Sequence, residues 1–204
     1  MTKHIFSLLA LGDSYTIGEG VPVYESFPYQ AVQMLRKQGF HFHAPELVAK
    51  TGWTTFELAE HILHTSLNEH YDFVTLLIGV NNQYRNLNAG DYKTDVEFLL
   101  KKAIHFAGER SDHVIVLSIP DWGVTPFAKE KDTQKIAMEI DEYNRLNKQV
   151  ALQYNVHYLD ITTATRSAAT DSTQVTADGL HPSGKVYAQW AQLLAGHISK
   201  TAGS

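Results

Sequence analysis

The sequence predicts an α/β fold, in which helices cover both faces of a five-stranded, mostly parallel sheet. Five short apolar runs, rich in β-branched or aromatic residues, alternate with longer segments of helical periodicity. This alternation is typical of strand–helix–strand units, whose strands pair in parallel. The run Phe73–Ile78 is almost continuously apolar, as in a strand buried on both faces. The sequence shows no internal repeat, low-complexity tract or linker, so we expect residues 1–204 to form one domain.

Each element follows from its own pattern. Strands are expected at the five apolar runs, which are Ile5–Leu11, Phe42–Ala49, Phe73–Ile78, Val114–Ile119 and Val156–Leu159. Helices are expected between and after these runs, at Pro28–Lys37, Thr55–Leu67, Tyr92–Ala107, Thr133–Tyr154 and Ser183–Ile198. The second of these helices has an apolar stripe at helical spacing, made of Phe56, Leu58, Ala59, Ile62 and Leu63.

The composition excludes several classes of protein. Hydrophobic residues make up 44% of the chain and charged residues 19%, which indicates a globular rather than a disordered protein. The formal net charge is −5 and the lysines and arginines form no run, which argues against a nucleic-acid partner and a polybasic membrane patch. Because there is no cysteine, disulfides, thiolate metal sites and a cysteine nucleophile are excluded.

The first apolar run, Ile5–Leu11, is interpreted as a buried strand and not as a secretory signal. The run is shorter than the apolar region of a secretory signal, and cleavage after it would remove part of the motif that begins at Gly12. No apolar run approaches the roughly 20 residues of a membrane span. We therefore expect a cytoplasmic protein without a membrane span.

A serine follows the first expected strand, where an α/β sheet places its ligands. Ligands bind outside the carboxyl ends of such strands, and the motif there is Gly12-Asp13-Ser14. A serine on a strand-to-helix turn can present its hydroxyl at this edge of the sheet. The same three residues also suit a turn glycine followed by a helix N-cap.

A histidine and an aspartate precede the last expected helix, in Asp178-Gly-Leu-His181-Pro182. Three residues apart, Asp178 and His181 can meet across one turn. A carboxylate on one imidazole nitrogen fixes the tautomer and leaves the other nitrogen to take a serine proton. A polar loop with an incidental histidine is the alternative, because the chain contains 11 histidines. Together with Ser14, the motif favours nucleophilic catalysis.

Two further motifs suit an oxyanion hole, which needs donors where negative charge develops. Gly52 follows the second expected strand, where its backbone N–H is free to donate, and Asn81 follows the third, where its side-chain amide can donate. The alternative is structural, with Gly52 and Gly79 as turn glycines and Thr54 and Asn81 as helix caps. Because these residues follow successive strands, their position favours the oxyanion hole over the structural interpretation.

These motifs resemble those of the SGNH (GDSL-type) hydrolase superfamily, in family order from Gly12 to Pro182. Gly12-Asp13-Ser14 resembles its first block, Gly52 its second, Gly79-Val80-Asn81-Asn82 its third and Asp178-Gly179-Leu180-His181-Pro182 its fifth. The resemblance implies a flavodoxin-like three-layer α/β/α fold and a triad of Ser14, Asp178 and His181. It also implies an oxyanion hole made of the Ser14 and Gly52 N–H groups and the Asn81 amide.

The chain departs from the family pattern at two positions. Tyr15 replaces the leucine of the GDSL name, and Asn82 replaces the aspartate usual in the third block. Neither position carries the implied chemistry, so both departures bear on substrate preference. Asp13 competes with Asp178 for the role of triad acid, and Asp178 is favoured because Asp13, next to Ser14 on a tight turn, is better placed to brace the loop.

Aromatic residues beside these motifs are candidates for the substrate pocket, although packing onto the domain explains them as well. They are Tyr15, Trp53, Tyr84, Trp122 and Phe127. The pairs His41/His43 and His61/His64 lack the further ligands of a metal site. The glycines from Gly12 to Gly20 lack the spacing of a phosphate-binding loop. We therefore expect neither a metal nor another cofactor.

The sequence thus predicts an enzyme, a carboxylic ester hydrolase that acts through an acyl-enzyme on a small-molecule ester. Short acyl chains are favoured because no long apolar lid segment is evident. A thioesterase or lysophospholipase for longer chains and a carbohydrate O-deacetylase are the alternatives among enzymes. An inactive carbohydrate-binding module on the same fold is the alternative from another class.

Overall fold

The structure, a computed structural model, describes residues 4–167 and 171–203. It contains one five-stranded sheet in the order β2-β1-β3-β4-β5, and every neighbouring pair is parallel. The strands are β1 (Leu8–Asp13), β2 (Glu46–Lys50), β3 (Phe73–Leu77), β4 (Val114–Leu117) and β5 (His157–Leu159). The predicted α/β fold with a parallel sheet is confirmed.

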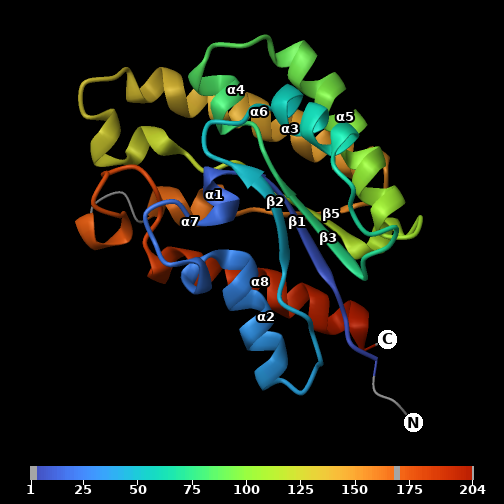
Figure 1. Cartoon of the computed structure of the whole chain (residues 1–204). Helices are drawn as coiled ribbons and strands as arrows, with labels where there is room; N and C mark the ends of the chain where they lie inside the picture. Colours follow the sequence, from blue (N-terminus) through green and yellow to red (C-terminus); the bar gives the residue numbers. More distant parts are fainter. Residues whose placement is uncertain (1–3, 168–170, 204) are drawn as a thin grey trace.

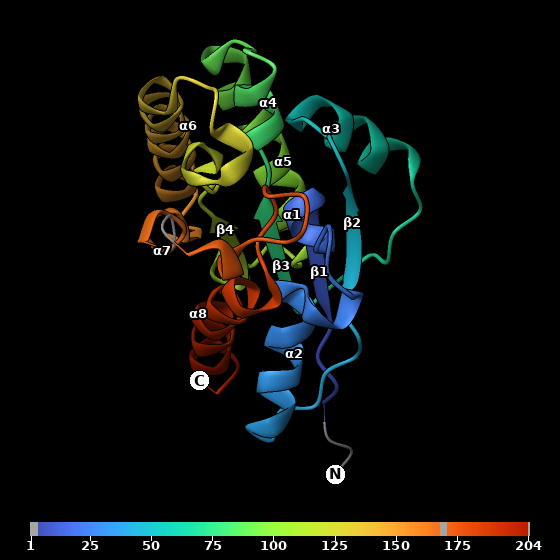
Figure 2. The ribbon, with the colours of Figure 1, turned by 90° about the vertical axis from the view of Figure 1, so that its left-hand side faces the viewer.

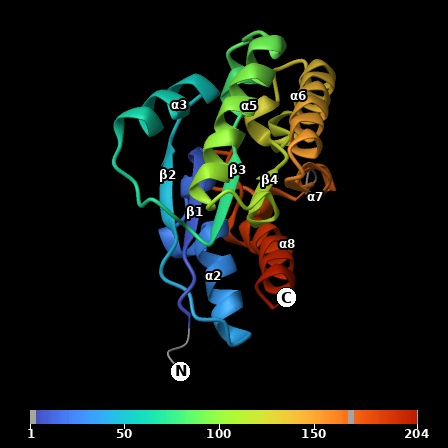
Figure 3. The same cartoon turned by 90° about the vertical axis from the view of Figure 1, so that its right-hand side faces the viewer.

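Five longer helices cover the two faces of the sheet (Figure 1). On one face α2 (Phe27–Lys37) lies beside α8 (Gly184–Ala202), and on the other are α3 (Thr55–His64), α5 (Ala89–Phe106) and α6 (Thr133–Gln153). Figure 3 shows α5 and α6 side by side over β3 and β4. Because both faces are covered, every residue of β1, β3 and β4 is buried. The result is the three-layer α/β/α arrangement that the family resemblance implied.

Three short helices lie at the carboxyl edge of the sheet (Figure 2). They are α1 (Ser14–Ile17), α4 (Val80–Tyr84) and α7 (Thr162–Ser167), which directly or closely follow β1, β3 and β5. Helical periodicity over a window of 11 or more residues does not detect such short segments. They carry or adjoin most of the motifs found in the sequence, and α1 and α4 lie on either side of the point where the strand order reverses.

The first two strands begin later than the sequence predicted, at Leu8 and Glu46. Phe6 forms only an isolated bridge with Phe42, and the backbone N–H of Ser7 donates to the Asp72 carboxylate. The expected starts at Ile5 and Phe42 are therefore wrong, because side-chain bonds replace the ladder there.

Three helices also differ from their expected bounds by three or more residues, and one of them is α8, which ends at Ala202 and not at Ile198. α5 begins at Ala89, three residues before Tyr92, because the Asn88 side chain accepts hydrogen bonds from the first turn and caps the helix. α3 ends at His64 and not at Leu67. Within residues 4–167 and 171–203, no helix is long and apolar enough to cross a bilayer.

Candidate active site

β1 leads directly into α1, and this places Ser14 at the carboxyl edge of the sheet. A Cβ at Gly12 would collide with the Thr16 side chain and the Leu77 carbonyl, so only glycine allows this close approach. The Asp13 carboxylate accepts the Tyr15 N–H at 3.0 Å and caps α1. The helix-cap interpretation is thus correct for Asp13, and the cap places Ser14 at the first position of the helix.

Ser14, His181 and Asp178 form a hydrogen-bonded series, although 167 residues separate the serine from the histidine. His181 Nε2 lies 2.9 Å from Ser14 Oγ, and His181 Nδ1 lies 2.6 Å from Asp178 Oδ2. The tilted ring of Tyr15 packs against the imidazole with 5.0 Å between the ring centroids. The structure therefore brings together all three side chains that the sequence singled out.

The Asp178 carboxylate is held as an anion. Burial acts to raise its pKa, but hydrogen bonds from the His181 side chain, from the backbone N–H groups of Leu180 and His181 and from the Thr176 hydroxyl lower the pKa to about 2. The Asp178 side chain is 41% exposed, whereas Ser14 and His181 are 3% and 6% exposed. The imidazole thus has a carboxylate at one nitrogen and a nearly buried serine hydroxyl at the other. In this arrangement a histidine can act as a general base.

Asp13 is fully buried and has different partners. Its carboxylate accepts from the Tyr15 N–H and, at 3.3 Å, from the Asn81 side chain. Burial raises the pKa of Asp13 to about 7, against the lowering effect of these hydrogen bonds. Asp13 thus braces the turn beside Ser14, and the carboxylate in contact with His181 is that of Asp178.

Gly52 lies in a β-turn that decides which way its N–H points. The Trp53 N–H donates to the Lys50 carbonyl at 3.2 Å, with Thr51 and Gly52 in the middle of the turn. Gly52 has a φ of 82° while Thr51 keeps a negative φ, the combination of a type II turn. A type I turn would reverse the central peptide and turn the Gly52 N–H to the opposite side.

The Asn81 amide projects from α4 toward that turn. Its Nδ2 donates to the Trp53 carbonyl at 3.0 Å and to Asp13 Oδ2 at 3.3 Å. The cap of α4 is Gly79, so the helix-cap interpretation is wrong for Asn81. It is correct for Thr54, which caps α3 in a capping box with Glu57.

Asn82, the departure from the family pattern, is 2% exposed and fits its neighbours as an amide. Its Oδ1 accepts from the Thr55 N–H at 3.0 Å and its Nδ2 donates to Thr55 Oγ1 at 2.7 Å. The hydroxyl of Thr55 in turn donates to the Asp95 carboxylate at 2.6 Å. An aspartate at position 82 would compete with Asp95 for the single hydroxyl hydrogen.

Comparison with protein families gives a match over most of the chain. The sequence model of the GDSL-like Lipase/Acylhydrolase family matches residues 10–189, from the middle of β1 into α8. The chain belongs to this family. It is therefore an enzyme of the hydrolase class, as the sequence predicted.

Solved structures with the same fold agree with this family. A lipase/acylhydrolase from Enterococcus faecalis is 22% identical, with 97% of each chain covered and a TM-score of 0.76. An acetylxylan esterase from Geobacillus stearothermophilus is 18% identical, with 95% of this chain and 94% of that chain covered and a TM-score of 0.74. A psychrotrophic esterase from a Pseudoalteromonas species is 16% identical, with 97% and 99% covered and a TM-score of 0.70. A search of curated proteins gives no match.

In this member of the GDSL-like family, three aromatic residues in the segments that follow β3 and β4 form a cluster. Centroid distances are 5.3 Å for Tyr84 and Trp122, 6.0 Å for Trp122 and Phe127, and 6.3 Å for Tyr84 and Phe127. Tyr84 and Phe127 are exposed, but Trp122 is buried and its indole N–H donates to Gln83 Oε1 at 2.6 Å. Gln83 is a residue that the sequence reasoning missed, and it connects α4 to the loop that carries Trp122.

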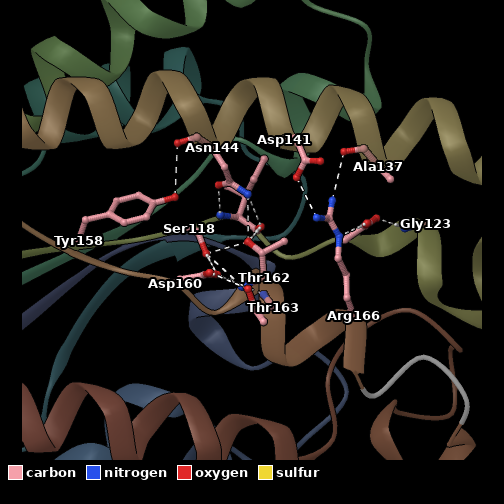
Figure 4. Close-up of polar contacts among 12 residues, drawn as sticks. Ser118, Gly123, Ala137, Asp141, Asn144, Tyr158, Asp160, Thr162, Thr163 and Arg166 are labelled. Carbon is pink, nitrogen blue, oxygen red and sulfur yellow. Dashed lines mark hydrogen bonds and ion pairs between the residues drawn. The ribbon is translucent and has the colours of Figure 1, made fainter.

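The loop after β4 is fixed at its base by a polar cluster between α6 and α7 (Figure 4). The Asn144 side chain bonds both the N–H and the carbonyl of Ile119, at 2.8 and 3.1 Å, and the Thr162 hydroxyl donates to the same carbonyl. Ser118 Oγ lies 2.7 Å from the oxygen of the same hydroxyl. The start of this loop therefore has little freedom.

An ion pair with a buried carboxylate holds the next part of the loop. Arg166 on α7 bonds the Asp121 carboxylate at 2.8 Å, and the Asp121 side chain is 1% exposed. Asp121 also accepts the Gly123 N–H at 2.9 Å, which closes the turn around Trp122. A second contact of Arg166, to Asp141 at 2.8 Å, ties the turn to α6 (Figure 4).

A largely apolar cavity of about 190 Å³ lies between the loop after β4 and the segment that leads to His181. Tyr15, Trp122 and Leu180 are among its lining residues, whereas Ser14 and His181 are not. Trp53 lies elsewhere and packs on His61, with 4.7 Å between ring centroids. Within the described part of the chain, no group of three or more His, Asp or Glu side chains is placed to hold a metal ion.

Proposed function

We propose that this protein is a serine esterase that hydrolyses carboxylic esters of short acyl chains through an acyl-enzyme. The observation that carries the proposal is the pair of contacts of His181, 2.9 Å from Ser14 Oγ and 2.6 Å from Asp178 Oδ2. A general base must lie within hydrogen-bond reach of the proton it removes, and its other nitrogen needs an orienting partner. The family supports the hydrolase class, and this geometry supports the assignment of roles.

In the first half-reaction, Ser14 Oγ attacks the ester carbonyl carbon while His181 Nε2 takes the serine proton. The tetrahedral intermediate collapses when its bond to the alcohol oxygen breaks, and the alcohol leaves with the proton from His181. In the second half-reaction, His181 removes a proton from water as the water attacks the acyl carbonyl carbon. The acid is released when the bond to Ser14 Oγ breaks and Ser14 takes the proton back from His181. Asp178 stabilises the imidazolium in both, and its low pKa keeps it ionised.

The oxyanion of each intermediate is assigned three donors, the Ser14 N–H, the Gly52 N–H and the Asn81 amide. In the resting enzyme the Asn81 amide already donates to the Trp53 carbonyl and to Asp13. The bond to Asp13 is the longer one, at 3.3 Å, so the oxyanion replaces Asp13 as the acceptor when it forms. In this exchange the oxyanion gains a donor that Asp13 Oδ2 gives up.

The test compares wild type and Ser14→Ala on p-nitrophenyl acetate and p-nitrophenyl octanoate. We expect wild-type activity that disappears in Ser14→Ala, together with a fluorophosphonate that labels wild type and not the variant. Activity that survives Ser14→Ala would contradict the assigned nucleophile. An inactive wild type that is not labelled would instead favour the carbohydrate-binding alternative.

The preference for short acyl chains is supported by the position of the apolar cavity. Tyr15 lines the cavity and also packs on the His181 ring, so it separates this space from Ser14. A series of p-nitrophenyl esters should give its highest kcat/KM at two to four carbons. A maximum beyond about eight carbons would mean that Tyr15 moves and that the cavity takes the chain, as in the thioesterase or lysophospholipase alternative.

A carbohydrate O-deacetylase is the second candidate. The fold is shared with an acetylxylan esterase, and Tyr84 and Phe127 offer exposed rings beside the site. Acetate release from acetylated xylooligosaccharides, compared with release from p-nitrophenyl acetate, separates the two. The cytoplasmic location remains a prediction from the sequence, which cell fractionation tests.

A further inference from the structure

Two side chains hold the turn that carries Gly52, one from each side. The Gly52 carbonyl accepts a hydrogen bond of 2.5 Å from Arg85 Nη2, and the Thr51 hydroxyl donates to the Glu19 carboxylate. Both contacts fall on the two central residues of the turn, whose shared peptide contains the Gly52 N–H. Arg85 and Glu19 therefore fix the position of the turn, and with it the position of the Gly52 N–H.

These two side chains come from the segments that carry the other proposed oxyanion donors. Arg85 is the C-cap residue of α4, the helix that contains Asn81. Glu19 follows α1, and its backbone N–H donates to the Ser14 carbonyl at 3.0 Å. A continuous series of contacts thus links the segments of Ser14, Gly52 and Asn81.

The guanidinium of Arg85 is itself oriented. Arg85 Nη1 lies 3.2 Å from Glu57 Oε1, and the other oxygen of Glu57 accepts the Thr54 N–H at 2.7 Å in the capping box of α3. The side chains of Arg85 and Glu57 are 44% and 38% exposed, and ion pairs this exposed contribute little to stability. The main effect of Arg85 is thus on the geometry of the turn and not on the stability of the protein.

We propose that Arg85 is a positioning residue of the oxyanion hole, which holds the turn with the Gly52 N–H in place against α4, with Glu19 as its counterpart on the other side. This inference rests on the proposed esterase function. Arg85 bonds the peptide carbonyl on one side of Gly52, and the donor to the oxyanion is the N–H on the other side. Its effect is therefore on the stability of the transition state and not on the binding of the substrate.

The experiment measures kcat and KM of Arg85→Met for p-nitrophenyl acetate. Loss of a whole oxyanion donor costs about 10²–10³ in kcat, so loosening one is expected to cost about tenfold, with KM changed less than twofold. Arg85→Lys should recover part of kcat, because an ammonium keeps the charge but not the two-pronged geometry. Arg145→Met is the matched control, since Arg145 pairs with Glu142 on the exposed surface of α6, away from the turn.

A double-mutant cycle distinguishes positioning from general loss of structure. If Arg85 acts through Gly52, Arg85→Met should cost nothing further in a Gly52→Ala background, where the same peptide is already displaced. Glu19→Ala should also lower kcat at unchanged KM, which keeps the proposal testable even if Arg85→Met does not fold.

Three results would overturn the inference. They are a folded Arg85→Met with kcat within twofold of wild type, a rise in KM at unchanged kcat, and equal losses in the wild-type and Gly52→Ala backgrounds. Failure of the esterase proposal looks different, because activity is then absent from wild type or survives Ser14→Ala. In that case the inference about Arg85 falls with it.

Discussion

Replacing Gly52 by alanine should separate the rate of the enzyme from its stability. Among the residues that the structure describes, a Cβ at this position meets only Arg85 Nη2, at 3.6 Å, which is ordinary van der Waals contact. The cost of the change is therefore the φ of 82°, about 1–2 kcal/mol for a residue with a side chain. The turn escapes this strain by reversing its central peptide to type I, which needs no positive φ.

The two effects differ in size. A reversed peptide presents the Thr51 carbonyl where the Gly52 N–H was, and loss of one oxyanion donor costs about 10²–10³ in kcat. A loss of about 1–2 kcal/mol leaves a protein of ordinary stability, about 5–15 kcal/mol, almost entirely folded. A drop in kcat of this size thus cannot come from unfolding.

Gly39→Ala is the matched control for backbone strain. Gly39 has a φ of 94°, and a Cβ there meets no atom of residues 4–167 and 171–203 within 4 Å. It follows α2, whose end lies at the opposite edge of the sheet from α1 (Figure 2). Both variants should lose similar stability in urea unfolding followed by circular dichroism, and only Gly52→Ala should lose activity on p-nitrophenyl acetate.

The reasoning is refuted if kcat of Gly52→Ala lies within fivefold of that of Gly39→Ala. The Gly52 N–H would then not be an oxyanion donor, or its direction would not depend on the glycine. Equal losses of activity in both variants would mean that strain anywhere in the chain lowers activity.

Three further variants test the surroundings of the site. Asn81→Ala should lower kcat by about 10²–10³, and a loss below fivefold would remove Asn81 from the mechanism. Burial raises the pKa of Asp13 from its ordinary 3.8 to about 7, so the folded state holds this proton more tightly than the unfolded chain. Wild type should therefore lose up to about 4 kcal/mol of stability as pH rises from about 4 to about 7. Asp13→Asn should flatten this dependence in urea unfolding, and an unchanged slope would mean that Asp13 does not titrate there. Asn82→Asp should cost about 1–3 kcal/mol because one hydroxyl hydrogen cannot serve two carboxylates, and adding Asp95→Asn should restore most of it. Additive losses in that double variant would contradict the hydrogen-bond assignment.

Much of the fold could be predicted because its strands and long helices have strong, local patterns. The continuous apolar run at β3 reflects burial on both faces of the sheet. The apolar stripe of α3 predicted the helix, although of its five residues Leu58 and Ile62 are buried while Phe56 and Leu63 are exposed. The ends of these elements depend on distant partners. Asp72 bonds the backbone of Ser7 across 65 residues, and nothing near Ser7 in the sequence indicates where β1 begins.

The contact of Ser14 with His181 and Asp178 could be expected because their motifs follow or precede elements that meet at one sheet edge. Their catalytic roles remain predictions. The role of Arg85 could not be expected, since its target, the Gly52 carbonyl, is a backbone group 33 residues away that has no side chain to suggest it. The one available signal is the polar run Asn81-Asn82-Gln83-Tyr84-Arg85, which directly follows a buried strand.

The side chains of this polar run fix the position of the short helix α4. Of its side chains, Asn81 and Arg85 bond the turn of Gly52, while Gln83 accepts the Trp122 indole N–H and donates to Glu139 of α6 at 2.7 Å. Five residues cannot form a stable helix by themselves, because nucleation is costly. The position of α4 is therefore set by these bonds, so a change in the Trp122 loop that moves α4 also moves the proposed oxyanion donors. We therefore expect changes in the Trp122 loop to alter kcat as well as substrate preference, through this one helix of five residues.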